Sequence, residues 1–357
     1  MVNRLKHFRV AAGMTQTKVA EALGITQPTY QRWEVGSIDI PEAKLVKLAK
    51  VLETTNEALL GRHPPVIAAF YGDSAPADLQ YYGEVAIHFH SGGESLLLSI
   101  SEEARIRLYR NLRLNPKFVT VKDLGNRTVA IRKSAISDLY LSSEAYDDYG
   151  PEHDEPGYRE GTPVQFPDSR DWEIIECLAC DSEGIEDLAE EDVERVKKAV
   201  MITDRQHTKL VADGCIKPEE LEAEKVKNTR TTNEIFEMAT SVVYQLSTGK
   251  RRFVNVTDCN LFEAFGNLVD DGGENFDEGS SILLQSEGYH RSVFINPDAV
   301  DYISIPTHLL GRSSDDTSAE MLDEFGDNHD GDKIKHHQRG KQKVASITEG
   351  TSEKGGK

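Results

Sequence analysis

Residues 15–36, which read TQTKVAEALGITQPTYQRWEVG, constrain the fold of this chain more than any other stretch. The apolar residues recur at the spacing of two short helices, roughly residues 16–23 and 27–35. A threonine stands at the N-cap position of each helix, where its hydroxyl can accept an amide hydrogen. Gly24 lies between them, where a tight turn needs a residue that tolerates a left-handed backbone. The stretch therefore predicts two helices joined by a short turn.

The outward face of the second predicted helix suits the major groove of DNA. It carries Gln27, Pro28, Gln31 and Arg32, none of which is acidic. Glutamine can form two hydrogen bonds with adenine, and arginine can do so with guanine or bind a phosphate. Pro28 is tolerated in the first turn because its missing N–H would have no helical partner there. We therefore expect this helix to read DNA bases.

Residues 23–36, LGITQPTYQRWEVG, resemble the lambda-repressor/Cro-like (XRE-type) helix-turn-helix family, whose usual wording is close to LGVSQSTISRWERG. The resemblance covers about the first 62 residues and implies an all-α head of five helices. This chain departs from the family pattern at two positions. Pro28 replaces a usual polar base-reading residue, and Tyr30 is larger than the usual isoleucine or valine.

The resemblance also implies roles for single residues. Gln16 matches a phosphate contact at a helix N-terminus, where the helix dipole favours an anion. Arg9 and Glu34 match a buried ion pair that joins the first and third helices. Lys44 is a further candidate for a phosphate contact, with a solvated helix face as the simpler interpretation. The full set of expected DNA-contacting residues is Gln16, Thr26, Gln27, Pro28, Thr29, Gln31, Arg32 and Lys44.

The resemblance further implies a homodimer on double-stranded DNA, because such heads usually bind half-sites ~34 Å apart in pairs. The charge of the chain fits this arrangement. The formal net charge is −20, yet residues 1–65 hold nine Lys and Arg against six Asp and Glu. A basic head on an acidic body leaves phosphate contact to the head, and the acidic body suits a protein partner with a basic surface.

Two segments of the body show the same pattern. Residues 88–112 align with residues 244–268, and residues 118–141 align with residues 282–305. Each of the two copies, taken as a whole, has the order strand, strand, helix, strand, strand, short turn and strand. This predicts an internal duplication, with chance similarity as the alternative. The offset grows from 156 to 164 residues, and the acidic, glycine-rich insert at residues 270–279 accounts for the change.

The predicted fold is therefore multidomain, with an all-α five-helix head, an α+β body and a disordered tail. The boundaries that we expect are as follows: head at residues 1–62, linker at 63–81, first α/β copy at 82–142, flexible acidic loop at 143–171, mixed connecting segment at 172–235, second copy at 236–310, and disordered tail at 311–357. Within the connecting segment, residues 172–179 are strand-like, and residues 185–199 and 218–227 have a helical pattern. A short helix near residues 319–325 is the one element expected in the tail.

No group of residues predicts an active site or a metal site. Cys177 and Cys180 form a CxxC, but a closed zinc site needs about four ligands and the sequence offers no second close pair. We interpret these cysteines as ordinary half-buried residues of a strand-like run. His88 and His90 share a strand face without an evident third ligand. We expect no enzymatic activity, no cofactor and no metal.

The chain has no run of about 18 apolar residues and no secretory signal pattern, so we expect no membrane span and a cytoplasmic location. The function predicted is that of a sequence-specific DNA-binding transcriptional regulator, whose acidic body serves oligomerisation or protein interaction. Two alternatives stay open: a body that senses a small molecule, and an antitoxin-like autorepressor.

Overall fold

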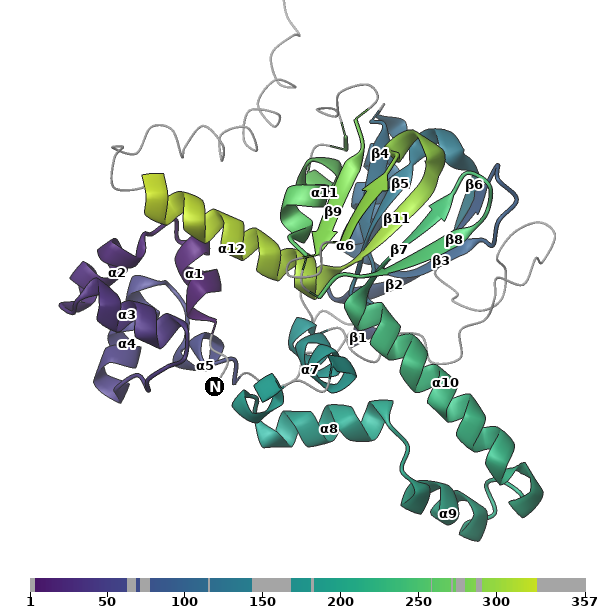
Figure 1. Cartoon of the computed structure of the whole chain (residues 1–357), viewed down its shortest axis with the longest axis horizontal. Helices are drawn as coiled ribbons and strands as arrows, with labels where there is room; N and C mark the ends of the chain where they lie inside the picture. Colours follow the sequence, from purple (N-terminus) through teal and green to yellow (C-terminus); the bar gives the residue numbers. More distant parts are fainter. Residues whose placement is uncertain are drawn as a thin grey trace, which may run out of the picture. The chain divides into compact units, whose positions relative to one another are not determined.

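The computed structural model describes residues 4–62, 69–70, 78–114, 116–142, 168–180, 183–257, 259–270, 272–273, 280–286 and 291–325 (Figure 1). The chain divides into two compact units. We call residues 3–59 together with residues 316–357 the head unit, and residues 60–315 together with residues 1–2 the body unit. Residues 143–167 of the flexible acidic loop expected at residues 143–171, and most of the linker expected at residues 63–81, lie outside the described residues. The last residues of that expected loop, 169–171, are helical rather than a loop.

The head unit is all-helical over residues 4–59, as predicted. Its helices are α1 (Leu5–Ala11), α2 (Gln16–Leu23), α3 (Gln27–Glu34), α4 (Glu42–Val51) and α5 (Asn56–Leu59). None exceeds ten residues, and isolated helices that short are marginal in water, so their stability comes from packing. The side chains that supply this packing are the buried Leu5, Val19, Leu23, Tyr30, Trp33, Leu45, Leu48 and Leu59.

The body unit contains antiparallel sheets that lie against each other. In one, β2 (Gln80–Phe89) pairs with β3 (Leu96–Ser101) and β6 (Ile136–Ser142), and the short β1 (Ala69–Phe70) pairs parallel to β2. A second sheet has five strands in the order β4-β5-β11-β7-β8. Its strands are β4 (Phe118–Lys122), β5 (Arg127–Arg132), β11 (Val300–Pro306), β7 (Ser241–Leu246) and β8 (Arg251–Asn255).

Both faces of the five-stranded sheet are covered at its middle strands, which explains why β5 and β11 are buried at nearly every position. Val129 and Ile131 join a core with β2, β3 and helix α6 (Glu102–Arg113). Ala130, between them in sequence, faces a core with helix α11 (Leu261–Asp270) and the hairpin of β9 (Ile282–Ser286) and β10 (Arg291–Ile295). Successive strand residues point to opposite faces, so one strand serves two cores.

The same order of elements occurs in both segments for which a duplication was predicted. Residues 80–142 give two strands, a helix, two strands, a 3₁₀ turn and a strand, and residues 241–306 give the same succession. In each, the first strand pairs with the second and with the last. Gly93 and Gly249, which are equivalent in the sequence alignment, meet each other: a Cβ on Gly249 would stand 3.2 Å from the Gly93 Cα. Common descent of the two segments stays a prediction.

Further expectations about element type or boundary were wrong. Residues 172–179 are not a strand but part of helix α7 (Ser169–Cys180), because Trp172, Ile175 and the half-buried Leu178 recur at helical spacing against α8 (Glu190–Val200) and α10 (Leu221–Thr240). The second α/β segment begins at β7 rather than at residue 236, since α10 continues through Thr240. The tail was expected to be disordered from residue 311 apart from a short helix near residues 319–325, whereas it is helical throughout residues 311–325, within α12 (Thr307–Phe325).

The described part of the connecting segment is helical. It contains α7, α8, α9 (Asp204–Ala212) and α10, so the helices expected near residues 185–199 and 218–227 correspond to α8 and α10. Residues 326–357 of the expected tail lie outside the part of the chain that the structure describes.

Arg127 ties several elements of the body unit together at the start of β5. Its guanidinium donates to the Ser304 hydroxyl at 2.8 Å and to the main-chain oxygens of Ser304, Met238 and Ser241 at 2.5, 2.6 and 3.0 Å. The residue is 4% exposed. A cation near the C-terminal end of α10 also complements the helix dipole.

Replacing Arg127 by methionine should therefore lower the free energy of unfolding of the body unit by about 2–4 kcal/mol, because buried acceptors lose their donor. Urea denaturation followed by far-ultraviolet circular dichroism measures this loss. Arg110→Met on the exposed face of α6 is the matched control, with an expected change within about 0.5 kcal/mol. Equal stability of the two variants would contradict the role given to Arg127.

Candidate nucleic-acid interface

Helices α2 and α3 are joined by a turn whose geometry follows from its sequence. The Thr15 hydroxyl accepts the Lys18 amide hydrogen at 3.1 Å and so caps α2. Gly24 ends α2 in a left-handed conformation, with φ of 62° and ψ of 48°. Thr26 occupies the N-cap position of α3 with an extended backbone, but its hydroxyl lies 2.9 Å from the Thr29 hydroxyl and does not cap an amide. The expected position of Thr26 is therefore right, whereas the side-chain cap is not formed.

Helix α3 separates a buried face from an exposed face. Tyr30 and Trp33 are buried at 0% and 3% exposure. Pro28, Gln31 and Arg32 are exposed. The Arg32 Nε atom donates to the Pro28 carbonyl oxygen at 3.2 Å, which lays the side chain along the helix surface. The three residues form an outward face at which base edges or phosphates can be contacted.

A buried ion pair connects α1 to α3. Arg9 donates from Nε and from one terminal nitrogen to the two oxygens of Glu34, at 3.2 and 3.0 Å. Each side chain is 1% exposed. This is the pair that the family resemblance implies. Burial by itself would lower the pKa of Arg9, but the hydrogen bonds and negative charge of Glu34 outweigh burial and raise the pKa above its usual value.

The charge of Glu34 also acts on Tyr30. Burial raises the pKa of the Tyr30 phenol far above its usual value, and the neighbouring Glu34 carboxylate adds to the shift. Tyr30 therefore stays neutral and packs as an aromatic core residue.

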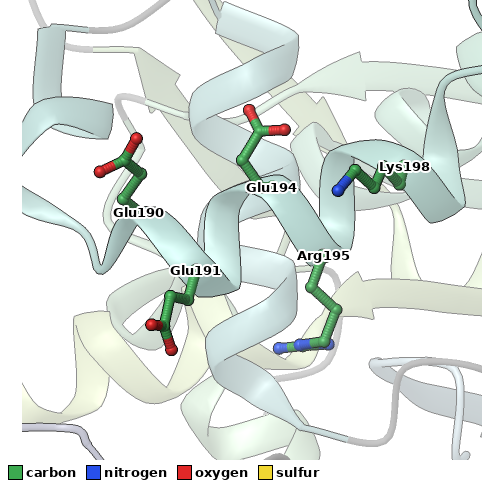
Figure 2. Close-up of a pocket in the computed structure, with 5 residues that line it drawn as sticks. All are labelled: Glu190, Glu191, Glu194, Arg195 and Lys198. Carbon is green, nitrogen blue, oxygen red and sulfur yellow. The ribbon is translucent and has the colours of Figure 1, made fainter.

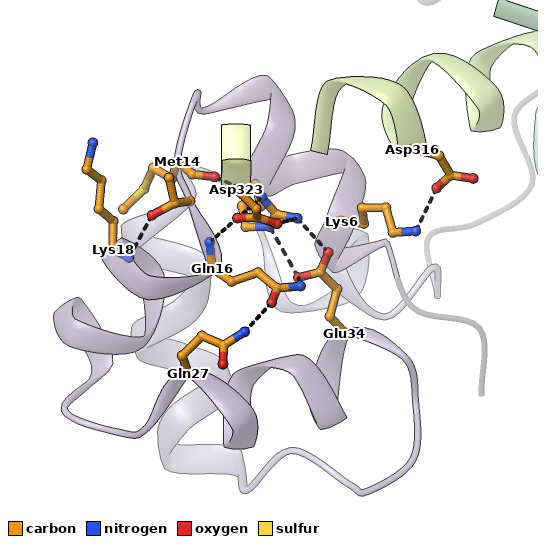
Figure 3. Close-up of polar contacts among 10 residues, drawn as sticks. Lys6, Met14, Gln16, Lys18, Gln27, Glu34, Asp316 and Asp323 are labelled. Carbon is orange, nitrogen blue, oxygen red and sulfur yellow. Dashed lines mark hydrogen bonds and ion pairs between the residues drawn. The ribbon is translucent and has the colours of Figure 1, made fainter. Parts of the chain in front are cut away.

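Gln16 and Gln27 extend this polar network between α2 and α3 (Figure 3). The Gln27 Nε2 atom donates to the Gln16 side-chain oxygen at 2.6 Å, and the Gln16 Nε2 atom donates to Glu34 at 3.3 Å. Gln27 is half-buried, unlike Gln31 and Arg32. The helical period predicts Gln27 on the outward face but does not predict this bond, because the period alone does not show which glutamines reach each other.

Lys44 takes a different role from the phosphate contact that was considered for it. Its ammonium donates to the Leu23 carbonyl oxygen at 2.6 Å, at the C-terminal end of α2. A cation there satisfies a carbonyl without a helical partner and complements the helix dipole. In this arrangement Lys44 joins α4 to α2, and its contact with phosphate stays a prediction.

The histidines and cysteines singled out in the sequence take part in ordinary contacts. His88 Nδ1 lies 2.5 Å from an Asp138 oxygen, and His90 Nδ1 lies 3.0 Å from the Ser137 hydroxyl. Cys177 and Cys180 lie at the end of helix α7, not in a strand, and burial raises the pKa of Cys177. Among the residues that the structure describes, no group of three or more His, Cys, Asp and Glu is placed to hold a metal ion.

A shallow hollow runs along α8 and is lined by Glu190, Glu191, Glu194, Arg195 and Lys198. Figure 2 shows that these side chains do not converge: Glu194 and Arg195 point to opposite sides of the helix. Arg195 instead pairs with Asp171 at 2.6 Å. The hollow therefore has no arrangement suited to one small ligand. Over the described ranges, no helix is long and apolar enough to cross a membrane.

Comparison with known proteins bears on the head unit. Residues 5–57 match the family model described as Helix-turn-helix. These residues form an XRE-type helix-turn-helix. The chain is also 36% identical over 61 residues to the SPbeta prophage-derived uncharacterized HTH-type transcriptional regulator YonR of Bacillus subtilis (strain 168). The match covers 17% of this chain and 56% of that relative. No solved structure matches the chain.

The Arg9–Glu34 pair gives a direct prediction for the helix-turn-helix. Arg9→Met leaves the Glu34 carboxylate buried without its main cation, so the head should lose about 3–5 kcal/mol of unfolding free energy. The double variant Arg9→Met/Glu34→Met should lose less, because no charge is then left buried. In a Trp172→Phe background, urea denaturation followed by the fluorescence of Trp33 reports on the head alone, since the chain has two tryptophans. A double variant as unstable as the sum of both single variants would contradict the pairing.

Proposed function

We propose that the protein is a sequence-specific DNA-binding transcriptional regulator in which α3 enters the major groove. The observation that carries this proposal is an XRE-type helix-turn-helix whose second helix exposes Pro28, Gln31 and Arg32. The printed name of the relative, an HTH-type transcriptional regulator, supports the same class.

The chemistry of α3 suits this role. The major groove is about 12 Å wide and admits one α-helix. Gln31 can form two hydrogen bonds with adenine, and Arg32 can bind guanine or a backbone phosphate. At the start of α2, the Gln16 main-chain N–H, which donates to the Asp323 carboxylate in this structure, can donate to a phosphate in its place, and the helix dipole adds to the attraction. Thr29 and Pro28 complete the face of α3 nearest its N-terminus, and apolar contact with a thymine methyl is open to both.

The assembly is part of the proposal. Two copies of the protein bind neighbouring half-sites ~34 Å apart, one helical turn of DNA, as is usual for this class of head. The acidic body holds the copies together or binds a protein partner with a basic surface. No contact among the described residues favours the small-molecule sensor or the antitoxin-like autorepressor over this reading, and an enzymatic role forms no part of it.

Arg32→Ala should weaken binding to a preferred site by about 1–3 kcal/mol and relax base preference at one position, if the guanidinium contacts a base. Sequencing of DNA captured from randomised duplexes by the full-length protein measures both effects. Gln31→Ala should relax preference at a neighbouring position. Equal weakening by Arg32→Ala on all sequences would make Arg32 a phosphate contact instead.

Arg205→Ala on α9 is the matched control, because it also removes one exposed arginine from a helix. Selected DNA sequences should be the same for this control and the unchanged protein. If the unchanged protein enriches no sequence, and the Gln31→Ala/Arg32→Ala double variant captures as much DNA as it does, the proposed function is wrong.

A further inference from the structure

The C-terminal part of α12 places a carboxylate at the start of helix α2. One Asp323 oxygen accepts the main-chain N–H of Gln16 at 2.9 Å (Figure 3). The same side chain pairs with the Arg9 guanidinium at 3.3 Å. Residues 316–325 of α12 and helices α1 and α2 all belong to the head unit. An acidic residue 307 positions further along the chain thus lies on the helix-turn-helix.

This position is one at which an anion is stabilised for physical reasons. The first amides of a helix have no partner inside the helix. The Thr15 hydroxyl satisfies the Lys18 amide, and Asp323 satisfies the Gln16 amide. The α2 dipole and the positive charge of Arg9 both attract negative charge to the same place. A DNA phosphate at this N-terminus would use the same donors.

The Asp323 contact is supported by others on the same side of α12. Asp316 pairs with Lys6 on α1 at 2.6 Å. Ala319 and Leu322 are buried at 6% and 9% exposure. At 100° per residue, positions 316, 319, 322 and 323 fall within an arc of about 120° on a helix. The end of α12 therefore combines an apolar stripe with two acidic residues, each paired to a group of the helix-turn-helix.

We propose that the end of α12 is an autoinhibitory segment in which the Asp323 carboxylate occupies the position that a DNA phosphate takes at the N-terminus of α2. The inference rests on the proposed function, because it concerns the same helix-turn-helix. A phosphate and the carboxylate cannot accept the same Gln16 N–H together, so DNA binds after residues 316–325 have left α2. By linkage, the contacts that hold residues 316–325 on the helix-turn-helix lower its affinity for DNA. Bound DNA weakens the docking of that segment by the same factor.

Asp323→Asn in the full-length protein tests the inference, because it keeps the shape of the side chain and removes its charge. Glu324→Gln is the matched control: it also removes one negative charge, from an exposed neighbour on the same helix. The probe is a 30-base-pair duplex of random sequence at low salt, since non-specific binding depends on phosphate contacts. We expect Asp323→Asn to bind about three- to tenfold more tightly than the unchanged protein, and Glu324→Gln to stay within about twofold.

A second measurement follows the contact without DNA. Amide hydrogen exchange at the start of α2 should be faster in Asp323→Asn than in the unchanged protein or in Glu324→Gln. Adding the duplex to the unchanged protein should speed exchange across residues 316–325. Thermal unfolding of both variants checks that the head remains folded.

The outcomes separate the two proposals. If the unchanged protein binds the duplex and Asp323→Asn binds no more tightly than Glu324→Gln, autoinhibition is wrong and DNA binding stands. If exchange across residues 316–325 does not respond to bound DNA, the segment is not displaced and autoinhibition is again wrong. If none of the three proteins binds the duplex, the proposed function fails, and autoinhibition fails with it.

Discussion

The buried Arg9–Glu34 pair is the interaction on which the helix-turn-helix depends. Helices of seven and eight residues do not persist alone, and this pair connects the first of them to the third across the core. Taking two charges out of water is costly. The pair is nevertheless stable because other groups satisfy the hydrogen-bonding capacity that Arg9 and Glu34 do not use on each other. The Met14 carbonyl oxygen accepts from Arg9, and the Gln16 side chain donates to Glu34. The residues that shape the outward face of α3 and the anion position at α2 are thus fixed by one polar network.

The body unit depends instead on apolar packing on both faces of its five-stranded sheet. Its central strand β11 pairs with β5, and these two strands come from different segments and lie more than 160 residues apart in sequence. Strands β11, β7 and β8 of the second segment form three strands of this sheet, and the β4–β5 hairpin of the first segment adds the other two. Neither segment completes this sheet alone, because the β7–β8–β11 part would leave β11 as an open edge. Arg127 strengthens the junction by binding carbonyl groups of α10 and β11.

The head could be predicted from sequence because its signals are local. Thr15, Gly24 and the alternation of buried and exposed residues set the bounds of α2 and α3 to within one residue. Helix α7 was misassigned since a short apolar run is compatible with both a strand and a helix, and only its partners α8 and α10 decide. The Gln16–Gln27 bond and the Asp323 contact join residues with no shared local pattern. Tertiary packing of this kind leaves no signal in a single sequence.

The meeting of Gly93 and Gly249 has a consequence for how this protein can change over evolutionary time. Gly249 has a φ of 76°, and a methyl group there would stand 3.2 Å from the main chain of Gly93. A methyl group on Gly93 would in turn overlap Gln245. A substitution at Gly249 therefore demands an adjustment of the main chain at Gly93, and a substitution at Gly93 demands an adjustment of Gln245 in β7. At this point the sequences of the two segments cannot change independently, so we expect their substitutions to be coupled.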